Sequence, residues 1–268
     1  MMSRFPATDR PLRELTFLGT GTSTGVPVIG CDCEVCQSEN PRFKRLRASV
    51  LISSPGGRVL IDTTPDLRQQ FLRENVPFAH AVMFTHHHAD HVFGLDDVRT
   101  FSRHLGKALP IYCEPATEAF IRRAFSYAFD EEVQAYPAGG VPKIEFHRIT
   151  RPTVEVLDHE VVPVPLEHGR YDVLGFRFGG LAYCTDVSRI PNESERLLED
   201  LDVLILDALR PQKHPTHFSL DEALDVVDRL RPRRTYFTHL SCQMHPERDA
   251  KRLPEGVAFA YDGLKLAF

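Results

Sequence analysis

Four side chains that can ligate a metal ion follow one apolar segment within six residues: His86, His88, Asp90 and His91. The segment at residues 79–85, AHAVMFT, is typical of a buried strand that delivers the next side chains to a sheet edge. Because side chains alternate along an extended chain, the first and third histidines share one side and the middle one points away. Asp90 and His91 are then spaced for a second ion, and imidazole with carboxylate favours zinc, iron or manganese over calcium or magnesium. A solvated histidine cluster, the alternative, requires neither the strand nor the carboxylate.

Three further candidates stand at the ends of apolar runs. His168 ends VVPVPLEH, Asp186 ends LAYCTD and His239 ends RTYFTH. Alone, each is typical of a cap or a solvated turn residue. Their shared placement indicates that several strand ends meet in one cleft, where seven ligands from four segments of the chain would converge.

Three cysteines form a C-x-C-x-x-C motif in a loop rich in glycine and proline: Cys31, Cys33 and Cys36. In a chain expected to be cytoplasmic, such clustering indicates metal binding before disulfide formation. A tetrahedral structural zinc needs a fourth ligand, for which we expect Cys242, with His245 as the alternative. A redox pair or unpaired thiols are the competing interpretations.

The candidate ligands require strands to position them, and apolar runs predict two series of strands. The runs are Leu15–Leu18, Ser49–Ser53, Val59–Asp62, Val82–Thr85, Leu109–Cys113, Ile144–Ile149, then Val154–Leu157, Val161–Leu166, Leu174–Phe178, Leu181–Thr185, Val203–Asp207, Thr235–Thr238 and Val257–Tyr261. Gly179 and Gly180 predict a hairpin turn. Helices interleave with both series, so we expect an α/β fold with two sheets face to face and helices outside, a single four-layer domain over residues 1–268.

Two helix starts are predicted from capping residues. Thr64 followed by Pro65 indicates an N-cap, with an inner face formed by Leu67, Phe71 and Leu72. Ser219 with Glu222 forms a capping box, ahead of a core-facing stripe formed by Leu220, Ala223, Leu224 and Val227. Asp62, which ends VLID, has two interpretations: it orients a ligand histidine, or it caps a helix together with Thr64.

Composition excludes several classes of protein. The 268 residues are 42% hydrophobic and 26% charged, which is typical of a globular chain. No apolar run approaches the roughly 18 residues that a membrane span needs, and the first ten residues lack the apolar core of a secretion signal, so we expect a cytoplasmic protein. The net charge of -5 argues against a protein that grips long nucleic acid.

The chain resembles the metallo-β-lactamase-fold hydrolases. Their H-x-H-x-D-H motif stands here as His86, His88, Asp90 and His91, and their distant ligands match His168, Asp186 and His239. The opening LGTGTSTGVPVIGCDCEVC and the later THLSC are most similar to the phosphodiesterase of the carbon–phosphorus lyase pathway, and next to ribonuclease Z. The resemblance implies an αβ/βα sandwich, and a homodimer is suggested by it.

The resemblance also implies a ligand scheme with two divalent ions, Zn or Mn, and a structural Zn. One active-site metal would take His86, His88 and His168, the other Asp90, His91 and His239, with Asp186 bridging. A histidine in the related phosphodiesterase assists at the phosphoryl group and matches His217; His214 is the weaker candidate. That relative completes its structural zinc with a histidine at the position of Cys242, so an all-cysteine site would be a departure.

The expected reaction is hydrolysis of a small or cyclic phosphodiester by a hydroxide that bridges the metals, with His217, Asp90 and Asp186 in catalytic roles. Ribonuclease Z-like RNA processing is the nearest alternative, but no long basic insertion is present to hold RNA. Lactone, lactam or thioester hydrolysis uses a similar metal centre. His217 argues against that chemistry.

Overall fold

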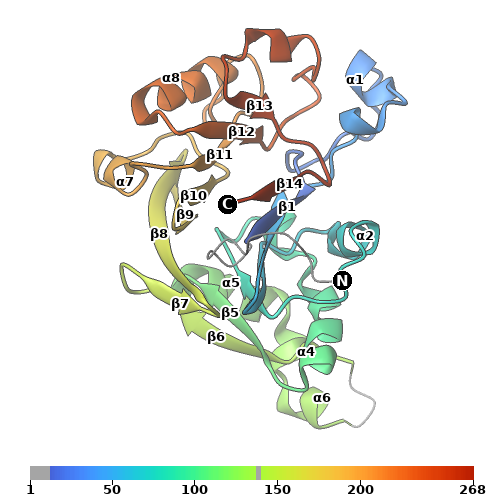
Figure 1. Ribbon diagram of the computed structural model, residues 1–268. Helices are drawn as coiled ribbons and strands as arrows, with labels where there is room; N and C mark the ends of the chain where they lie inside the picture. The colour runs from blue at the N-terminus through green and yellow to red at the C-terminus, as the bar shows by residue number, and fades with distance from the viewer. Residues whose placement is uncertain (1–12, 137–139) are drawn as a thin grey trace, which may run out of the picture.

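The computed structural model describes residues 13–136 and 140–268 and contains two seven-stranded sheets that face each other (Figure 1). The first sheet has the order β14-β1-β2-β3-β4-β5-β6 and the second β13-β12-β11-β10-β9-β8-β7. The strands are β1 Glu14–Gly19, β2 Ser49–Ser54, β3 Gly57–Ile61, β4 Ala81–Met83, β5 Leu109–Cys113, β6 Ile144–Arg148, β7 Val154–Val156, β8 His159–His168, β9 Tyr171–Phe178, β10 Leu181–Cys184, β11 Val203–Asp207, β12 Arg234–Thr238, β13 Val257–Phe259 and β14 Lys265–Ala267.

Helices cover the outer side of each sheet (Figure 1). The α-helices are α1 Glu34–Gln37, α2 Leu67–Arg73, α3 Ala89–Val92, α4 Arg99–Leu105, α5 Pro115–Ala124, α6 Glu131–Ala135, α7 Asn192–Arg196 and α8 Leu220–Leu230, and the 3₁₀ helices are η1 Pro41–Phe43, η2 Leu95–Val98, η3 Ser126–Phe129 and η4 Asp249–Arg252. Apolar residues of α2, η2, α4 and α5 pack on the first sheet, and those of α8 pack on the second. The predicted four-layer sandwich is confirmed.

Successive side chains point to opposite faces of each sheet, so apolar residues form a core on both faces. On β3, Val59 and Ile61 join the cluster between the sheets, and Leu60 joins the cluster beneath the helices. On β11, Val203 faces the shared core and Leu204 faces the helix layer. A fully buried side chain of this size contributes roughly 1.5–3 kcal/mol, so both faces of the strands hold the sandwich together.

The two predicted helix starts have different outcomes. Ser219 caps α8 in a complete capping box with Glu222, as predicted. The Thr64 prediction is wrong, because α2 begins after Asp66, and the Thr64 hydroxyl instead accepts a hydrogen bond from the Asp66 backbone N–H (3.1 Å). Leu72 is also wrong as an inner residue: it is 64% exposed, and the buried residues of α2 are Leu67, Gln70 and Phe71.

The last strand was not predicted from the sequence. β14 pairs antiparallel with β1, Leu266 opposite Leu15, although the preceding β13 belongs to the other sheet. Only Leu266 of its three residues is buried, so its apolar pattern is too short to be recognised. The first ten residues, examined for a secretion signal, lie outside the described part. Within residues 13–136 and 140–268, no helix is long and apolar enough to cross a membrane.

Candidate metal centre

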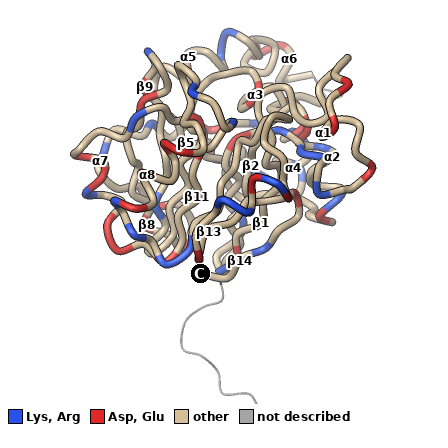
Figure 2. Tube along the Cα trace, turned by 90° about the horizontal axis from the view of Figure 1, so that it is seen from above, with Lys and Arg blue, Asp and Glu red and all other residues tan. Residues whose placement is uncertain are grey.

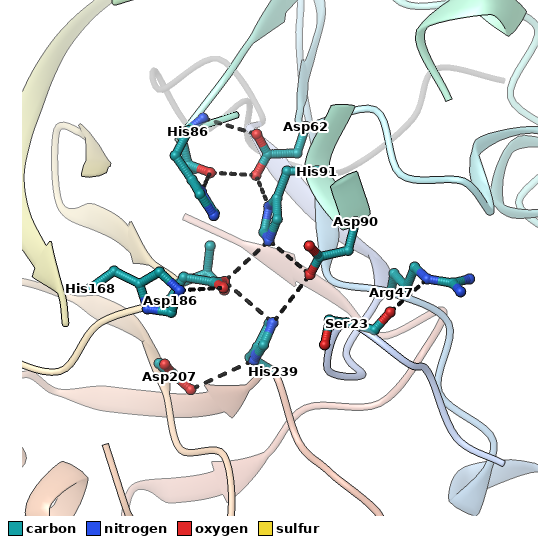
Figure 3. Close-up of polar contacts among 12 residues, drawn as sticks. Ser23, Arg47, Asp62, His86, Asp90, His91, His168, Asp186, Asp207 and His239 are labelled. Atoms are coloured by element: carbon teal, nitrogen blue, oxygen red, sulfur yellow. Dashed lines mark hydrogen bonds and ion pairs between the residues drawn. The ribbon is translucent and has the colours of Figure 1, made fainter. Parts of the chain in front are cut away.

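The candidate ligands lie where strands of both sheets end. β3, β4 and β5 are parallel in the first sheet, and β10, β11 and β12 are parallel in the second. Carboxyl ends of parallel strands meet at one sheet edge, which is the usual ligand site of such sheets. Residues that end or follow these strands gather in one place (Figure 3). They are Asp62, His86, Asp186, Asp207 and His239.

Three of these residues leave their strands in the left-handed backbone region. The φ angle is 64° at Asp62, 54° at Asp186 and 57° at His239. Aspartate and histidine tolerate this region better than most residues, but such a conformation still costs of order 1 kcal/mol. Strain of this kind concentrates at functional sites. Here it accompanies three side chains that point into the same cluster (Figure 3).

Two groups of side chains converge as metal ligands would. Ring nitrogens of His86, His88 and His168 lie within 4.8 Å of one another. Ligand atoms of the second group lie equally close, and that group is Asp90, His91, Asp186 and His239. The structure therefore brings together all seven residues that the sequence singled out, in the two sets implied by the resemblance.

Asp186 stands between the two groups. Its Oδ1 atom lies 3.3 Å from Nε2 of His91 and 3.4 Å from Nε2 of His239. Its Oδ2 atom lies 3.9 Å from Nε2 of His168, which belongs to the other group. The buried Asp186 carboxylate therefore presents one oxygen to each group.

Hydrogen bonds to Nδ1 fix the orientation of three of the ligand histidine rings. Nδ1 of His168 lies 2.6 Å from the carbonyl oxygen of Thr216, which can only accept, so this nitrogen carries the proton. Nδ1 of His91 lies 2.8 Å from Asp62, and Nδ1 of His86 lies 3.0 Å from the Thr85 hydroxyl. In each case Nε2 is left for a metal, an arrangement common around bound zinc.

Asp62 holds more than one group at the centre. Besides His91, its carboxylate accepts hydrogen bonds from the backbone N–H (2.9 Å) and hydroxyl (2.8 Å) of Thr85. Of its two interpretations, the contact with His91 agrees with the first, in which Asp62 orients a ligand histidine. The N-cap position of α2 belongs to Asp66.

Two observations show that this donor set fits divalent metal ions. Nε2 of His86, His91 and His239 is buried without a hydrogen-bond partner in the described part of the chain, and such a group is costly unless something binds it. Burial lowers the pKa of His91, but three surrounding aspartates raise it well above its usual value. The position therefore favours a positive charge, which a metal ion supplies.

A further histidine lies beside the two groups. His217 is buried, and its ring centroid lies 4.5 Å from that of His168 and 4.8 Å from that of His239. Its Nδ1 atom lies 2.6 Å from Oδ2 of Asp207. Burial lowers the pKa of His217, yet Asp207, with smaller contributions from other aspartates, raises it to about 9. This pKa favours the protonated imidazole at neutral pH. The ring nitrogens of His217 also lie close to ligand atoms of His168 and Asp186, whereas His214 belongs to no such group.

Asp207 was missed in the sequence. It ends the apolar run VLILD, just as Asp186 and His239 end their apolar runs. The position at the end of a strand could therefore have identified it as a candidate site residue. Its carboxylate also accepts a hydrogen bond from the backbone N–H of Val187 (2.9 Å).

A second cluster gathers four cysteines. Sulfur atoms of Cys31, Cys33, Cys36 and Cys242 lie within 4.8 Å of one another. The alternative ligand His245 is not in this group, and its Nε2 atom lies 3.4 Å from Glu34. Burial and the neighbouring thiols raise the pKa of Cys242 to about 12. Joint ionisation of four such sulfurs requires a cation among them, so the group fits zinc.

Arg45 supports the loop that carries Cys242. It is buried and donates hydrogen bonds to the carbonyl oxygens of Ser241 (2.6 Å) and Met244 (2.9 Å), on either side of that cysteine. Burial lowers the pKa of Arg45 to about 10. The guanidinium therefore remains charged at neutral pH and offsets negative charge on the sulfurs.

Comparisons with known proteins agree with this geometry. The family model described as the beta-lactamase superfamily domain matches residues 57–240. The chain belongs to the metallo-β-lactamase superfamily. Homologues with this fold bind metal ions, and membership of this hydrolase superfamily supports an enzyme.

Among solved structures, a diphosphatase from the PhnP family is 44% identical, with a TM-score of 0.89, over 96% of this chain and 97% of that one. Human tRNase Z, short form, shares the fold at 20% identity and a TM-score of 0.68, over 94% of this chain and 98% of that one. The octanoyltransferase of Porphyromonas gingivalis (strain ATCC BAA-308 / W83) is 37% identical over 254 residues, 92% of this chain. The chain spans 50% of the length of that relative.

Proposed function

We propose that this hydrolase cleaves a small phosphodiester, using two divalent ions, Zn or Mn, held by the seven convergent ligands. A structural Zn on the four cysteines is part of the same proposal. The 44% identity to a PhnP-family diphosphatase supports phosphorus chemistry. The observation that carries it is His217, whose imidazole is held by Asp207 beside both ligand groups.

Bound at these ligands, the ions would act as Lewis acids and lower the pKa of water. Hydrolysis then forms a bond between a water oxygen and phosphorus and breaks the bond to the leaving oxygen. That oxygen gains negative charge and needs a proton. His217 can donate this proton or stabilise the charge, because Asp207 holds the imidazole in its charged form.

The chain's own residues also set the geometry of the site. Asp62 and the Thr216 carbonyl fix the rings of His91 and His168 through Nδ1. Five of the seven ligand side chains are buried, which limits the access of competing water: His86, His91, His168, Asp186 and His239. No protein nucleophile is required.

A small substrate suits the charge of the molecule. The net charge is -5, and basic and acidic residues are interspersed along the chain trace in Figure 2. RNA processing, by contrast, requires a basic surface that tracks the backbone. We propose on the same ground that nucleic acid is not the substrate, and, from the resemblance alone, that the chain forms a homodimer.

Acyl hydrolysis is the competing function, because the curated relative is named for acyl transfer. Oxyester and thioester cleavage needs the same Lewis acids but produces a different charge distribution. A substrate panel separates the two: a chromogenic phosphodiester, a phosphomonoester, a lactone, an acyl thioester and a cephalosporin. We expect the diester to be cleaved best, and His217→Ala to reduce its kcat by roughly 10²–10⁴-fold.

His214→Ala is the matched control, a neighbouring histidine outside both ligand groups. Undiminished diester turnover by His217→Ala would remove His217 from the reaction. Turnover of the lactone, thioester or cephalosporin alone would refute the substrate class.

A further inference from the structure

We propose that aromatic side chains bordering the metal centre form a binding site for a planar ring carried by the phosphodiester substrate, such as a nucleobase. We call these side chains the aromatic shelf: His87, Phe93, Phe120 and Tyr171. The inference rests on the proposed function, because it assigns the group attached to the phosphoryl centre. It goes beyond that function by naming where the group binds.

The shelf is continuous with the metal centre. The ring of His88, one of the seven convergent ligands, lies 5.4 Å from that of Tyr171 at an interplanar angle of 85°. His87 lies 6.4 Å from Tyr171 and 5.3 Å from Phe120. Phe120 in turn lies 6.3 Å from Phe93. A substrate held at the ligands therefore meets Tyr171 first and the other rings next.

Four separate parts of the fold supply these rings. His87 lies within the histidine motif, Phe93 follows α3, Phe120 lies on α5, and Tyr171 begins β9. The ligand motif itself thus contributes the middle histidine, which belongs to neither ligand group, and places Phe93 two residues after His91.

The shelf keeps apolar area open to solvent. Large apolar side chains of this chain are mostly buried, yet Phe93 is 50% exposed and Tyr171 is 39% exposed. Neighbouring exposed rings are unfavourable in water unless something covers them. A planar ring inserted against them would gain stacking and remove this area from water.

Two arginines give the shelf positive charge. The guanidinium carbon of Arg170 lies 5.1 Å from the centroid of Tyr171, and that of Arg123 lies 5.6 Å from the centroid of Phe120. A phosphodiester is an anion, so positive charge next to apolar rings suits a ligand that joins a phosphate to a base. A purely aliphatic ester would leave the rings uncovered.

The test compares two diesters that differ only in the base. Thymidine 5′-ethyl phosphate and its abasic counterpart, 1,2-dideoxyribose 5-ethyl phosphate, present the same phosphorus and the same leaving groups. With the wild type, we expect kcat/KM for the thymidine diester to exceed that for the abasic one by roughly fivefold to a hundredfold, the range that base–aromatic stacking gives. Phe120→Ala and Tyr171→Leu should bring this ratio towards one, whereas Tyr171→Phe should preserve it.

Tyr136→Ala is the control, because Tyr136 is also an exposed aromatic residue (67%) but follows α6. It should leave the ratio at the wild-type value. A wild-type ratio of one, or a ratio that Phe120→Ala, Phe93→Ala and Tyr171→Leu all leave unchanged, would overturn the shelf.

Binding gives a second readout that does not depend on turnover. Equilibrium dialysis of labelled thymidine 5′-phosphate against ribose 5-phosphate should show the nucleotide bound more tightly, and Phe120→Ala should remove the difference. If neither diester is cleaved, the proposed function fails, and the dialysis measurement alone then tests whether the aromatic shelf binds a planar ring. Equal binding of both compounds by the wild type would then refute it.

Discussion

His217 and Asp207 form a buried pair, with Nδ1 of the imidazole 2.6 Å from Oδ2 of the carboxylate. The other oxygen of Asp207 lies 4.0 Å from Nδ1 of His239 (Figure 3). One carboxylate therefore hydrogen-bonds His217 and lies beside His239, one of the convergent ligands, without a hydrogen bond to it. This relationship places the charge of His217 next to the metal centre.

We expect Asp207→Asn to move the alkaline limb of the pH profile. In the wild type, activity that needs protonated His217 should fall as pH rises through about 9. Removing the carboxylate charge destabilises the imidazolium, so its pKa falls and the limb should shift to lower pH by roughly one to three units. Diester kcat measured from pH 5 to 10.5 tests this.

Asp202→Asn is the control for that experiment, because Asp202 lies at the opposite end of the same strand and its side chain is 48% exposed. An alkaline limb that Asp207→Asn leaves in place would show that the two residues are not coupled in the reaction.

Metal analysis should find about three ions per chain, two at the convergent ligands and one at the cysteines. Asp186→Ala removes a residue shared by both groups, so we expect its metal content to fall to about one. Cys113→Ala, at a buried cysteine in β5, should retain the wild-type content. A wild-type value near one, in protein purified without added ions, is incompatible with two separate sites.

The fourth cysteine ligand can be identified by two substitutions. Cys242→Ala should lose the structural zinc and lower thermal stability, since a closed site requires four ligands. His245→Ala should retain the zinc, because that imidazole lies with Glu34 and outside the sulfur group. Zinc per chain and the unfolding midpoint are the measurements. Retention by Cys242→Ala together with loss by His245→Ala would reverse the assignment.

Asp62→Asn should weaken metal binding without removing a ligand. The amide cannot supply the carboxylate charge that holds Nδ1 of His91, and changes of this kind typically reduce metal affinity by about 10–100-fold. Competition with a chelator measures the affinity. Asp66→Asn, at the N-cap of α2, is the comparison, because Asp66 binds Arg47 instead. Equal affinities in the two variants would argue against an orienting role for Asp62.

Much of the fold could be predicted because its strands are apolar. The runs around Val203 and Leu181 are buried on both faces, and the turn at Gly179 and Gly180 joins β9 to β10 as expected. The failures are local. Thr64 bonds within its turn instead of capping α2, and β14 has too few apolar residues to be recognised.

The candidate ligands were identified because each stands at the end of a strand. Convergence of His168 with His86, however, depends on the packing of two sheets, which no local pattern encodes. Asp207 was overlooked because a single aspartate after a strand has many ordinary roles. The aromatic shelf was equally invisible, since Phe93 and Phe120 become neighbours only when α3 and α5 pack on the first sheet.

The position of β14 has a consequence for how the molecule can be assembled. Its partner is β1, and Leu266 pairs with Leu15, which lies near the other end of the described chain in sequence. Contacts between such distant segments form slowly because of the entropy lost in closing the loop between them. During synthesis, the edge of β1 stays unpaired until residues 265–267 have left the ribosome. Until then, that edge is available to pair with other chains, which makes nascent or truncated forms prone to aggregation.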